Sequence, residues 1–195
     1  MLDGEEPPFV AGRPLTRAAL AWAATVHGDQ RRAVDRAPFI LHPLEVAALL
    51  NGRGYDDEVI AAGLLHDVIE DTDVGVVDVR ERFGERVARI VAAVSEDPAI
   101  EEYHRRKAAL RDQVAVADSD AQAVFAADKV VKARELRAQA AHTEALLDDP
   151  DLHRRLEHYE QCLRMLQSVA GDHPFVHQLG FELWALHRLP PTREG

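Results

Sequence analysis

The sequence predicts an all-α protein, folded as a compact bundle of helices joined by short loops. Apolar residues recur at helical spacing along most of the chain, and Gly or Pro separates one such stretch from the next. Alternation of the kind seen in strands is nearly absent, and there is no internal repeat. The length of 195 residues suits one domain with a sizeable core.

We expect a single domain over residues 14–189, between a flexible N-terminal tail of residues 1–13 and a C-terminal tail of residues 190–195. The first tail is rich in Pro, Gly and acidic residues. Pro190 and Pro191 close the ordered part because proline cannot continue a helix. The domain boundaries are therefore set by composition at both ends.

Three helices are predicted in the first part of the domain, at about residues 16–28, 42–51 and 56–70. Thr16 is a suitable N-cap for the first helix, which ends near Gly28. A polar loop with three arginines follows. Gly52 stops the second helix, and Asp56 begins the third because an acidic residue suits a helix N-terminus.

The remaining predicted helices cover about residues 78–83, 85–94, 101–117, 121–141, 150–170 and 174–189. Gly84 separates the first two of them. Asp118 and the two residues after it are suitable caps for the helix that follows. Pro150 and Pro174 each start a helix, a position that proline favours.

Composition argues against several classes of partner. A net charge of −11 is unfavourable for general nucleic-acid binding, which depends on Lys and Arg at the phosphates. The single cysteine, Cys162, cannot form an internal disulfide. No apolar run approaches the roughly 20 residues that span a bilayer, and the acidic N-terminus does not resemble a signal peptide. We therefore expect a cytoplasmic protein with neither a nucleic-acid nor a membrane partner.

The most informative stretch is an apolar run that suddenly becomes ionisable, LLHDVIED at residues 64–71. His66 and Asp67 can both ligate one divalent metal ion. On a helix, Glu70 and Asp71 each lie four residues after one of these ligands and share its face. Four ionisable groups after an apolar run are costly to bury unless they are paired or bound to a metal. The alternative is a helix that runs out of the core into solvent.

Two further residues extend the ligand set to two histidines and two aspartates. His42 precedes Pro43 at the start of a predicted helix, and Asp128 is a lone acid in an apolar stretch. Alone, each has an ordinary explanation, as a hydrogen-bonded loop histidine or a solvent-facing aspartate. Together with His66 and Asp67 they form a mixture of imidazole and carboxylate that suits Mn²⁺ or Fe²⁺.

In order and spacing these motifs resemble the HD-domain phosphohydrolases, and in particular the RelA/SpoT-type guanosine tetraphosphate hydrolase domain and its small stand-alone relatives. The resemblance covers about residues 15–137. A lone His-Asp pair would carry no weight, whereas an ordered set of motifs does. The matching segments are HGDQRR (27–32), APFILHPLEVA (37–47), AGLLHDVIEDT (62–72) and AADK (126–129).

The resemblance implies a fold and a reaction. It implies an all-α HD-domain bundle with one central divalent metal ion, usually Mn²⁺. The implied ligands are His42, His66, Asp67 and Asp128. Glu70 and Asp71 would position and activate the water that attacks the 3′ α-phosphorus of guanosine tetraphosphate or pentaphosphate, the alarmones of the stringent response. Pyrophosphate would leave, and because no room remains for a synthetase domain, we expect degradation only.

The resemblance also implies a set of contacts to a small-molecule nucleotide. The implied residues are Arg31, Arg32, Arg105, Arg106, Lys107, Lys132 and Tyr159. Arg32 could grip phosphate or stack on a base, and the cluster at residues 105–107 lies near the departing phosphates in relatives. A solvated surface is the alternative for both clusters. Tyr159 also lies on an apolar helical stripe that is typical of a core.

One position departs from the family pattern. Relatives commonly have an asparagine four residues after the metal-binding aspartate, and this chain has Lys132 there. A lysine favours an extra phosphate on the substrate or an ion pair with Glu70 or Asp71, and it equally suits a solvated face. The remaining alternatives are removal of the 2′-phosphate of NADPH, hydrolysis of nucleoside di- or triphosphates, and a nucleotide-sensing protein without turnover.

Overall fold

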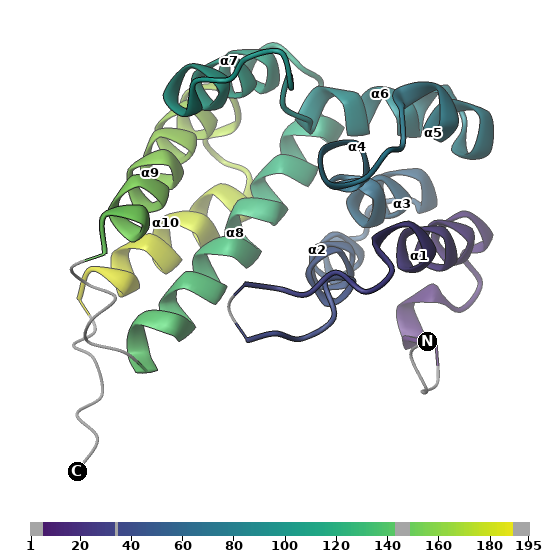
Figure 1. The fold of residues 1–195 in the computed structure, drawn as a ribbon, viewed down its shortest axis with the longest axis horizontal. Helices are drawn as coiled ribbons and strands as arrows, with labels where there is room; N and C mark the ends of the chain where they lie inside the picture. Colours follow the sequence, from purple (N-terminus) through teal and green to yellow (C-terminus); the bar gives the residue numbers. More distant parts are fainter. Residues whose placement is uncertain (1–5, 34, 143–148, 189–195) are drawn as a thin grey trace. The chain divides into compact units, whose positions relative to one another are not determined.

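The computed structural model describes residues 6–33, 35–142 and 149–188, and these ranges are all-α as the sequence predicts (Figure 1). In chain order the helices are η1 (Pro8–Val10), α1 (Pro14–His27), α2 (Leu41–Gly52), α3 (Asp57–Leu65), α4 (Val68–Asp71), α5 (Val76–Phe83), α6 (Glu85–Val94), α7 (Tyr103–Ala115), α8 (Ser119–His142), α9 (Pro150–Ala170) and α10 (Pro174–Leu186). Over the described ranges, β pairing is limited to one isolated antiparallel bridge between Arg31 and Pro38. None of the helices described is long and apolar enough to cross a membrane.

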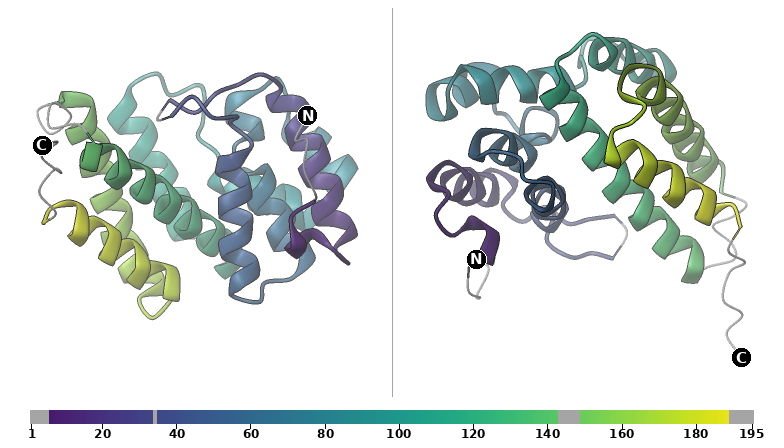
Figure 2. Two further views of the ribbon diagram at one scale, coloured as in Figure 1. Left: turned by 90° about the horizontal axis from the view of Figure 1, so that it is seen from below. Right: turned by 180° about the vertical axis from the view of Figure 1, so that it is seen from behind.

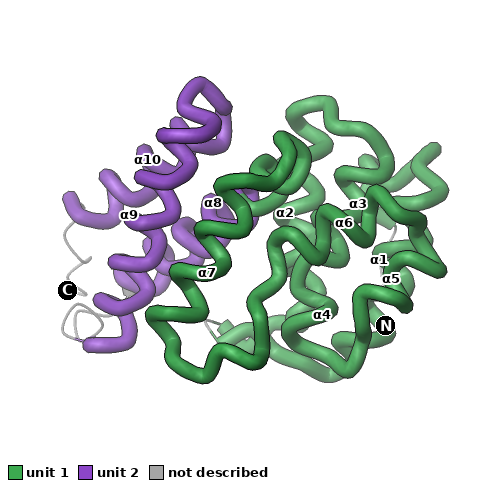
Figure 3. Tube along the Cα trace, turned by 90° about the horizontal axis from the view of Figure 1, so that it is seen from above, with its two compact units in different colours: residues 1–125 green, residues 126–195 purple. Residues whose placement is uncertain are grey.

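The chain divides into two compact units, residues 1–125 and 126–195, which Figure 3 colours separately. The boundary falls inside α8, so this one helix begins in the first unit and continues into the second. In the second unit α9 and α10 pack side by side, as the two views of Figure 2 show. A single domain over residues 14–189 stays a prediction.

Helix α3 is the centre of the first unit. It packs against α1, α2 and α6, and each of its residues from Val59 to Leu65 is buried. Small residues allow this all-round contact: a Cβ atom on Gly63 would lie 2.5 Å from Cδ1 of Leu50 on α2. Since α3 is enclosed by its neighbours, the residue that follows it, His66, has a firmly held main chain.

The start of α1 differs from the sequence prediction. The helix begins at Pro14, and Thr16 lies inside it. The Asp57 carboxylate of α3 accepts hydrogen bonds from the Thr16 amide at 2.9 Å and the Leu15 amide at 3.1 Å. Thr16 as an N-cap is therefore wrong, because a carboxylate from another helix satisfies the amides of the first turn.

Part of the predicted N-terminal tail belongs to the first unit. The turn η1 packs against α1, and Val10 is fully buried. Ordered structure thus begins before residue 14. The other predicted tail residues, 1–5 and 190–195, lie outside the described ranges.

Candidate metal centre

The predicted helix over residues 56–70 is in fact two helices, α3 and α4, separated by His66 and Asp67. Nδ1 of His66 donates a hydrogen bond to the carbonyl oxygen of Gly63 at 2.8 Å. In a continuous helix the Asp67 amide would donate to that same carbonyl. The prediction of one helix is wrong because the histidine side chain competes with the main chain for this acceptor.

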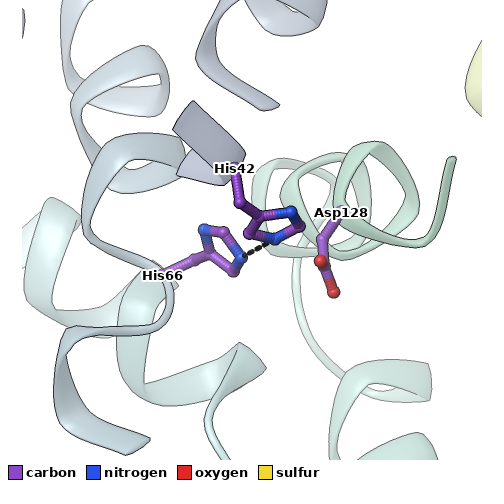
Figure 4. A group of neighbouring side chains, drawn as sticks. All are labelled: His42, His66 and Asp128. Carbon is purple, nitrogen blue, oxygen red and sulfur yellow. Dashed lines mark hydrogen bonds between the residues drawn. The ribbon is translucent and has the colours of Figure 1, made fainter. Parts of the chain in front are cut away.

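Two imidazoles meet where α3 ends and α2 begins. His42 and His66 are both buried, and their Nε2 atoms lie 3.3 Å apart (Figure 4). Since Nδ1 of His66 donates to a carbonyl, Nε2 of the neutral ring presents a lone pair. Oδ2 of Asp67 lies 3.1 Å from Nε2 of His66 and 3.5 Å from Nε2 of His42. Three donor atoms from the first unit therefore converge.

This arrangement fits a divalent metal ion. Two nitrogens that bind one ion at about 2.1 Å lie roughly 3.0–3.4 Å apart at octahedral or tetrahedral angles, and the observed separation of the two Nε2 atoms is 3.3 Å. The hydrogen bond at Nδ1 of His66 also fixes the ring orientation, as is usual for metal-binding histidines. The donor set contains no thiolate, which favours a borderline first-row cation over a soft one.

Asp128 is the next candidate ligand. It lies on α8, one turn after Val124, and its side chain is 5% exposed. Asp128 offers a buried carboxylate oxygen, and its place in one metal site with His42 and His66 stays a prediction. The chemistry of this group suits a divalent cation.

Two lysines of the second unit contact Asp128. Nζ of Lys129 donates to Oδ2 at 2.6 Å, and Nζ of Lys132 lies 3.2 Å from Oδ1. Burial alone would lower the pKa of Lys129, but the Asp128 carboxylate outweighs burial and raises it. The ion pair between Lys132 and Asp128 is an arrangement that the sequence analysis did not consider.

Tyr159 belongs to the core of the second unit. It is 8% exposed on α9, and burial raises the pKa of its hydroxyl above the ordinary value. The apolar stripe along this helix therefore has the core character that is typical of such a pattern. A contact between Tyr159 and substrate stays a prediction.

The two acids of the motif lie on α4 and are exposed. Oε1 of Glu70 accepts a hydrogen bond from the Glu96 amide at 2.8 Å, and the Asp71 amide donates to the Asp67 carbonyl at 3.0 Å. His66 and Asp67 keep helix-like backbone angles (φ −59°, ψ −32° and φ −94°, ψ −5°). The exposed carboxylates of Glu70 and Asp71 thus follow the buried candidate ligands His66 and Asp67 within about one helical turn.

Comparison with known proteins agrees with this reading of the motifs. A family model described as the HD domain matches residues 19–173. The chain belongs to the HD-domain family. A solved structure described as a metazoan ortholog of SpoT that hydrolyses ppGpp is similar to this HD-domain protein, with a TM-score of 0.72 and 26% identity over 95% of this chain and 97% of the other.

Two curated relatives carry the name guanosine-3′,5′-bis(diphosphate) 3′-pyrophosphohydrolase. The protein of Aquifex aeolicus (strain VF5) is 48% identical over 77 residues, which are 40% of this chain and 11% of that protein. MESH1 of Homo sapiens is 30% identical over 156 residues, 78% of this chain and 83% of MESH1. The chain therefore spans only about a tenth of the bacterial relative and most of the human one.

Arg31 and Arg32 lie between α1 and α2, ahead of His42 in the chain. Arg31 is exposed and pairs through its main chain with Pro38. The Arg32 guanidinium donates to Asp35, and to Oε1 of Glu45 at 3.0 Å. In the HD-domain protein this arginine is therefore already engaged by carboxylates of its own unit.

The second basic cluster surrounds Glu96. Nε of Arg106 donates to Oε2 of Glu96 at 2.5 Å, and Lys107 donates to Oε1. Arg105 is exposed. Burial would raise the pKa of Glu96, but the hydrogen bonds from Lys107 and Arg106 outweigh it and lower the pKa. The cluster thus anchors the segment between α6 and α7.

Two residues in contact with α4 were given no role by the sequence analysis. The Glu96 amide donates a hydrogen bond to the Glu70 carboxylate, and Nε2 of Gln30 donates to the Asp71 carbonyl at 2.8 Å. Gln30 lies inside the HGDQRR segment that matches the family. That motif is the sequence feature that could have identified Gln30 as a functional residue. A neutral amide in a polar loop offers no other indication.

Proposed function

We propose that this HD-domain protein hydrolyses ppGpp and pppGpp to GDP and GTP, releasing pyrophosphate, with one divalent ion, Mn²⁺. The observation that carries the proposal is the convergence of His42, His66 and Asp67 directly before the acids Glu70 and Asp71. Metal-dependent hydrolysis of a phosphoester needs both a cation site and a group that takes a proton from water. The names of the relatives support this choice of substrate.

Each part of the motif has a role in the proposed reaction. His42, His66, Asp67 and Asp128 would hold the ion. When bound, a divalent ion supplies Lewis-acid chemistry, polarising a phosphoryl oxygen and making water more acidic. Glu70 and Asp71 orient the attacking water and accept its proton.

The bonds that change in this reaction are those at the 3′ ester. The water oxygen attacks the 3′ α-phosphorus, and the bond from that phosphorus to O3′ breaks. Pyrophosphate leaves, and O3′ takes up a proton to become the 3′-hydroxyl of GDP or GTP. One water molecule is consumed for each nucleotide.

The contacts to substrate phosphate are part of the proposal. Arg31 and Arg105 are exposed and accessible to a nucleotide. Arg32, Arg106 and Lys107 already bind carboxylates, so a phosphate must join or replace these partners. Competition of this kind favours a ligand with several negative charges, such as a guanosine nucleotide with two diphosphates.

The deciding experiment is release of pyrophosphate from ppGpp by the purified protein, measured with Mn²⁺ and with chelator. We expect GDP and pyrophosphate in equal amounts, and only when Mn²⁺ is present. Glu70→Gln should lower turnover by about a hundredfold or more and leave the metal content unchanged. Asp73→Asn, which changes an exposed acid on the same segment, is the matched control and should retain activity.

Two results would contradict the proposal. If the metal is bound but ppGpp is not cleaved, the substrate is wrong, and NADPH and nucleoside triphosphates are tested next. If nucleotides bind without any turnover, the protein is a sensor and not an enzyme. Full activity of Glu70→Gln would contradict the catalytic role proposed for Glu70 and leave the rest of the proposal unaffected.

A further inference from the structure

The acids of the proposed site lie on an unusually small element. Helix α4 has four residues, Val68–Asp71, and a single helical turn is only marginally stable by itself. Local hydrogen bonds contribute little to its stability. The Asp71 amide donates to the Asp67 carbonyl, and Oγ1 of Thr72 donates to the Val68 carbonyl at 2.6 Å. Contacts from elsewhere in the first unit must therefore fix the acids.

Gln30 provides one such contact at the C-terminal end of α4. Its Nε2 donates to the Asp71 carbonyl oxygen at 2.8 Å. A carbonyl at the end of a helix has no partner within the helix, and the chain leaves α4 in an extended conformation at Thr72 (φ −140°, ψ 179°). The glutamine thus holds the main chain of the residue that carries the second acid.

The orientation of the Gln30 amide is fixed by its two neighbours. The Asp71 carbonyl can only accept, so the NH₂ group of Gln30 must face it. Oε1 then faces Nδ1 of His27 at 2.9 Å, and that nitrogen must carry the ring proton. Nε2 of His27 is buried and has no hydrogen-bond partner among the described residues, so Nδ1 makes the ring's hydrogen bond.

The same ring connects Gln30 to the metal ligands. His27 is buried at the end of α1, and its ring centroid lies 4.7 Å from that of Phe39. Phe39 in turn lies 5.9 Å from the ring of His42, and the Phe39 amide donates to the Gln30 carbonyl at 3.0 Å. A continuous set of contacts within the first unit therefore runs from His42 to the main chain of Asp71.

We infer that Gln30 is a positioning residue, which holds α4 so that Glu70 and Asp71 keep a fixed place relative to the metal ligands. This inference rests on the proposed function for the role of the acids. A catalytic group displaced by about 1 Å can lose about a hundredfold in rate. One hydrogen bond to a single-turn helix is therefore sufficient to affect turnover without any contact to substrate.

Glutamate at this position tests the inference with little change in shape. In Gln30→Glu, one oxygen still accepts from His27, while the other meets the Asp71 carbonyl without a proton to donate. Gln30→Met removes both hydrogen bonds without adding charge. We expect kcat for pyrophosphate release to fall about tenfold or more in both variants, with KM and bound metal within about twofold of the original protein.

The matched control is Gln122→Glu. Nε2 of Gln122 donates to the carbonyls of Val114 and Ala117 at 3.3 and 3.1 Å, so it also caps main-chain acceptors in the first unit, away from α4. This variant should lower the melting temperature and leave kcat within about twofold. If Gln30 had only a structural role, its variants would likewise lower the melting temperature and leave kcat within about twofold.

Amide hydrogen exchange over residues 68–72 separates this inference from the proposed function. Exchange without nucleotide should be faster in Gln30→Glu and Gln30→Met, and unchanged in Gln122→Glu. Unchanged exchange, unchanged kcat, or loss of metal would each overturn the positioning role. If the original protein does not cleave ppGpp, the proposed function fails, and the exchange comparison still decides whether Gln30 holds α4.

Discussion

Asp128 stands between two lysines of the second unit, one on each carboxylate oxygen. Lys132 is the more exposed of the two, with 30% of its side chain accessible. An ammonium group 3.2 Å from Oδ1 of Asp128 repels a second cation that binds the same carboxylate. In the proposed metal site, Lys132 should therefore weaken the binding of the ion.

Replacement of Lys132 by methionine should strengthen Mn²⁺ binding. The variant keeps the bulk of the side chain and removes its charge, and we expect Kd to fall by about three- to tenfold, or roughly 0.7–1.4 kcal/mol, since solvent screens part of the repulsion. Calorimetric titration of metal-free protein with Mn²⁺ measures the change. Arg154→Met removes a cation from the exposed pair with Asp151 and should not alter Kd. An unchanged or weaker affinity of Lys132→Met would disprove the repulsion.

Single residues differ in how well the sequence reveals them. His42, His66 and Asp128 are conspicuous because each is an ionisable group in an apolar segment, and all three are buried. Gln30 and Glu96 lie in polar segments and look like surface residues. Their contacts join positions 41 and 26 residues apart, and such distant hydrogen bonds leave no local pattern in the sequence.

At the scale of elements, the contact between α2 and α3 depends on the absence of a side chain at Gly63. A Cβ atom there would lie 2.5 Å from Cδ1 of Leu50 and 3.5 Å from Cγ1 of Val46. Leu50 is itself fully buried, so a shift of its side chain would disturb other core residues. The helix that positions His66 is therefore tightly constrained on this side.

Alanine at position 63 should destabilise the protein by about 1–3 kcal/mol, the usual effect of overpacking a core. Denaturant unfolding gives this free energy. Gly52→Ala is the matched control, since Gly52 also lies in a helix and a Cβ there meets nothing within 4 Å. That variant should be neutral or more stable by up to about 1 kcal/mol. Equal effects of the two substitutions would contradict the packing argument.

The segment between α6 and α7 depends on the ionised Glu96. Arg106 and Lys107 lower the pKa of Glu96 in spite of burial, and the Glu96 amide faces the carboxylate of Glu70. A carboxyl whose pKa is lower in the folded state stabilises fully above its unfolded pKa, about 4.3 for glutamate. This stabilisation is lost as the pH falls through the lower folded pKa.

Glu96→Gln should therefore show a smaller loss of unfolding free energy between neutral pH and about pH 3 than the original protein. Urea unfolding across this range measures the difference. Glu85→Gln changes an acid that pairs with Arg80 and is 72% exposed, and it should leave the pH dependence unaltered. Parallel pH profiles for Glu96→Gln and the original protein would exclude the linkage.

Helix boundaries were predictable where backbone geometry sets them locally. Gly84 separates α5 from α6 with φ at 88°, a conformation that glycine adopts readily. The break after Leu65 and the start of α1 were not predictable, because a His66 side chain and an Asp57 carboxylate replace main-chain partners there. Such replacement depends on neighbours in space.

For the whole molecule, the apolar periodicity was enough to predict the all-α class. It could not predict two compact units, because their boundary at residues 125 and 126 falls inside α8. An uninterrupted helix has no glycine, proline or change of composition to mark such a boundary. Because one continuous helix joins the two units, the sequence does not reveal the boundary between them.

Metal binding should stabilise the whole molecule, since the folded chain assembles ligands that an unfolded chain keeps apart. At a free Mn²⁺ concentration of about 100 times Kd, linkage adds about 2.7 kcal/mol. For a chain of this size that corresponds to roughly 5–10 °C in melting temperature. Chelator should remove the increase, and calorimetry or a dye-based thermal scan measures it.

Asp67→Ala tests whether this stabilisation comes from the proposed ligands. Oδ2 of Asp67 lies close to both ligand imidazoles, so the variant should lose bound metal and show no rise in melting temperature with Mn²⁺. Asp73→Ala removes an exposed carboxylate from the same segment and should keep the full rise. If Asp67→Ala retains the metal content and the thermal shift of the original protein, the metal is held elsewhere in the molecule. Coordination by Asp67 is then wrong, whatever the substrate.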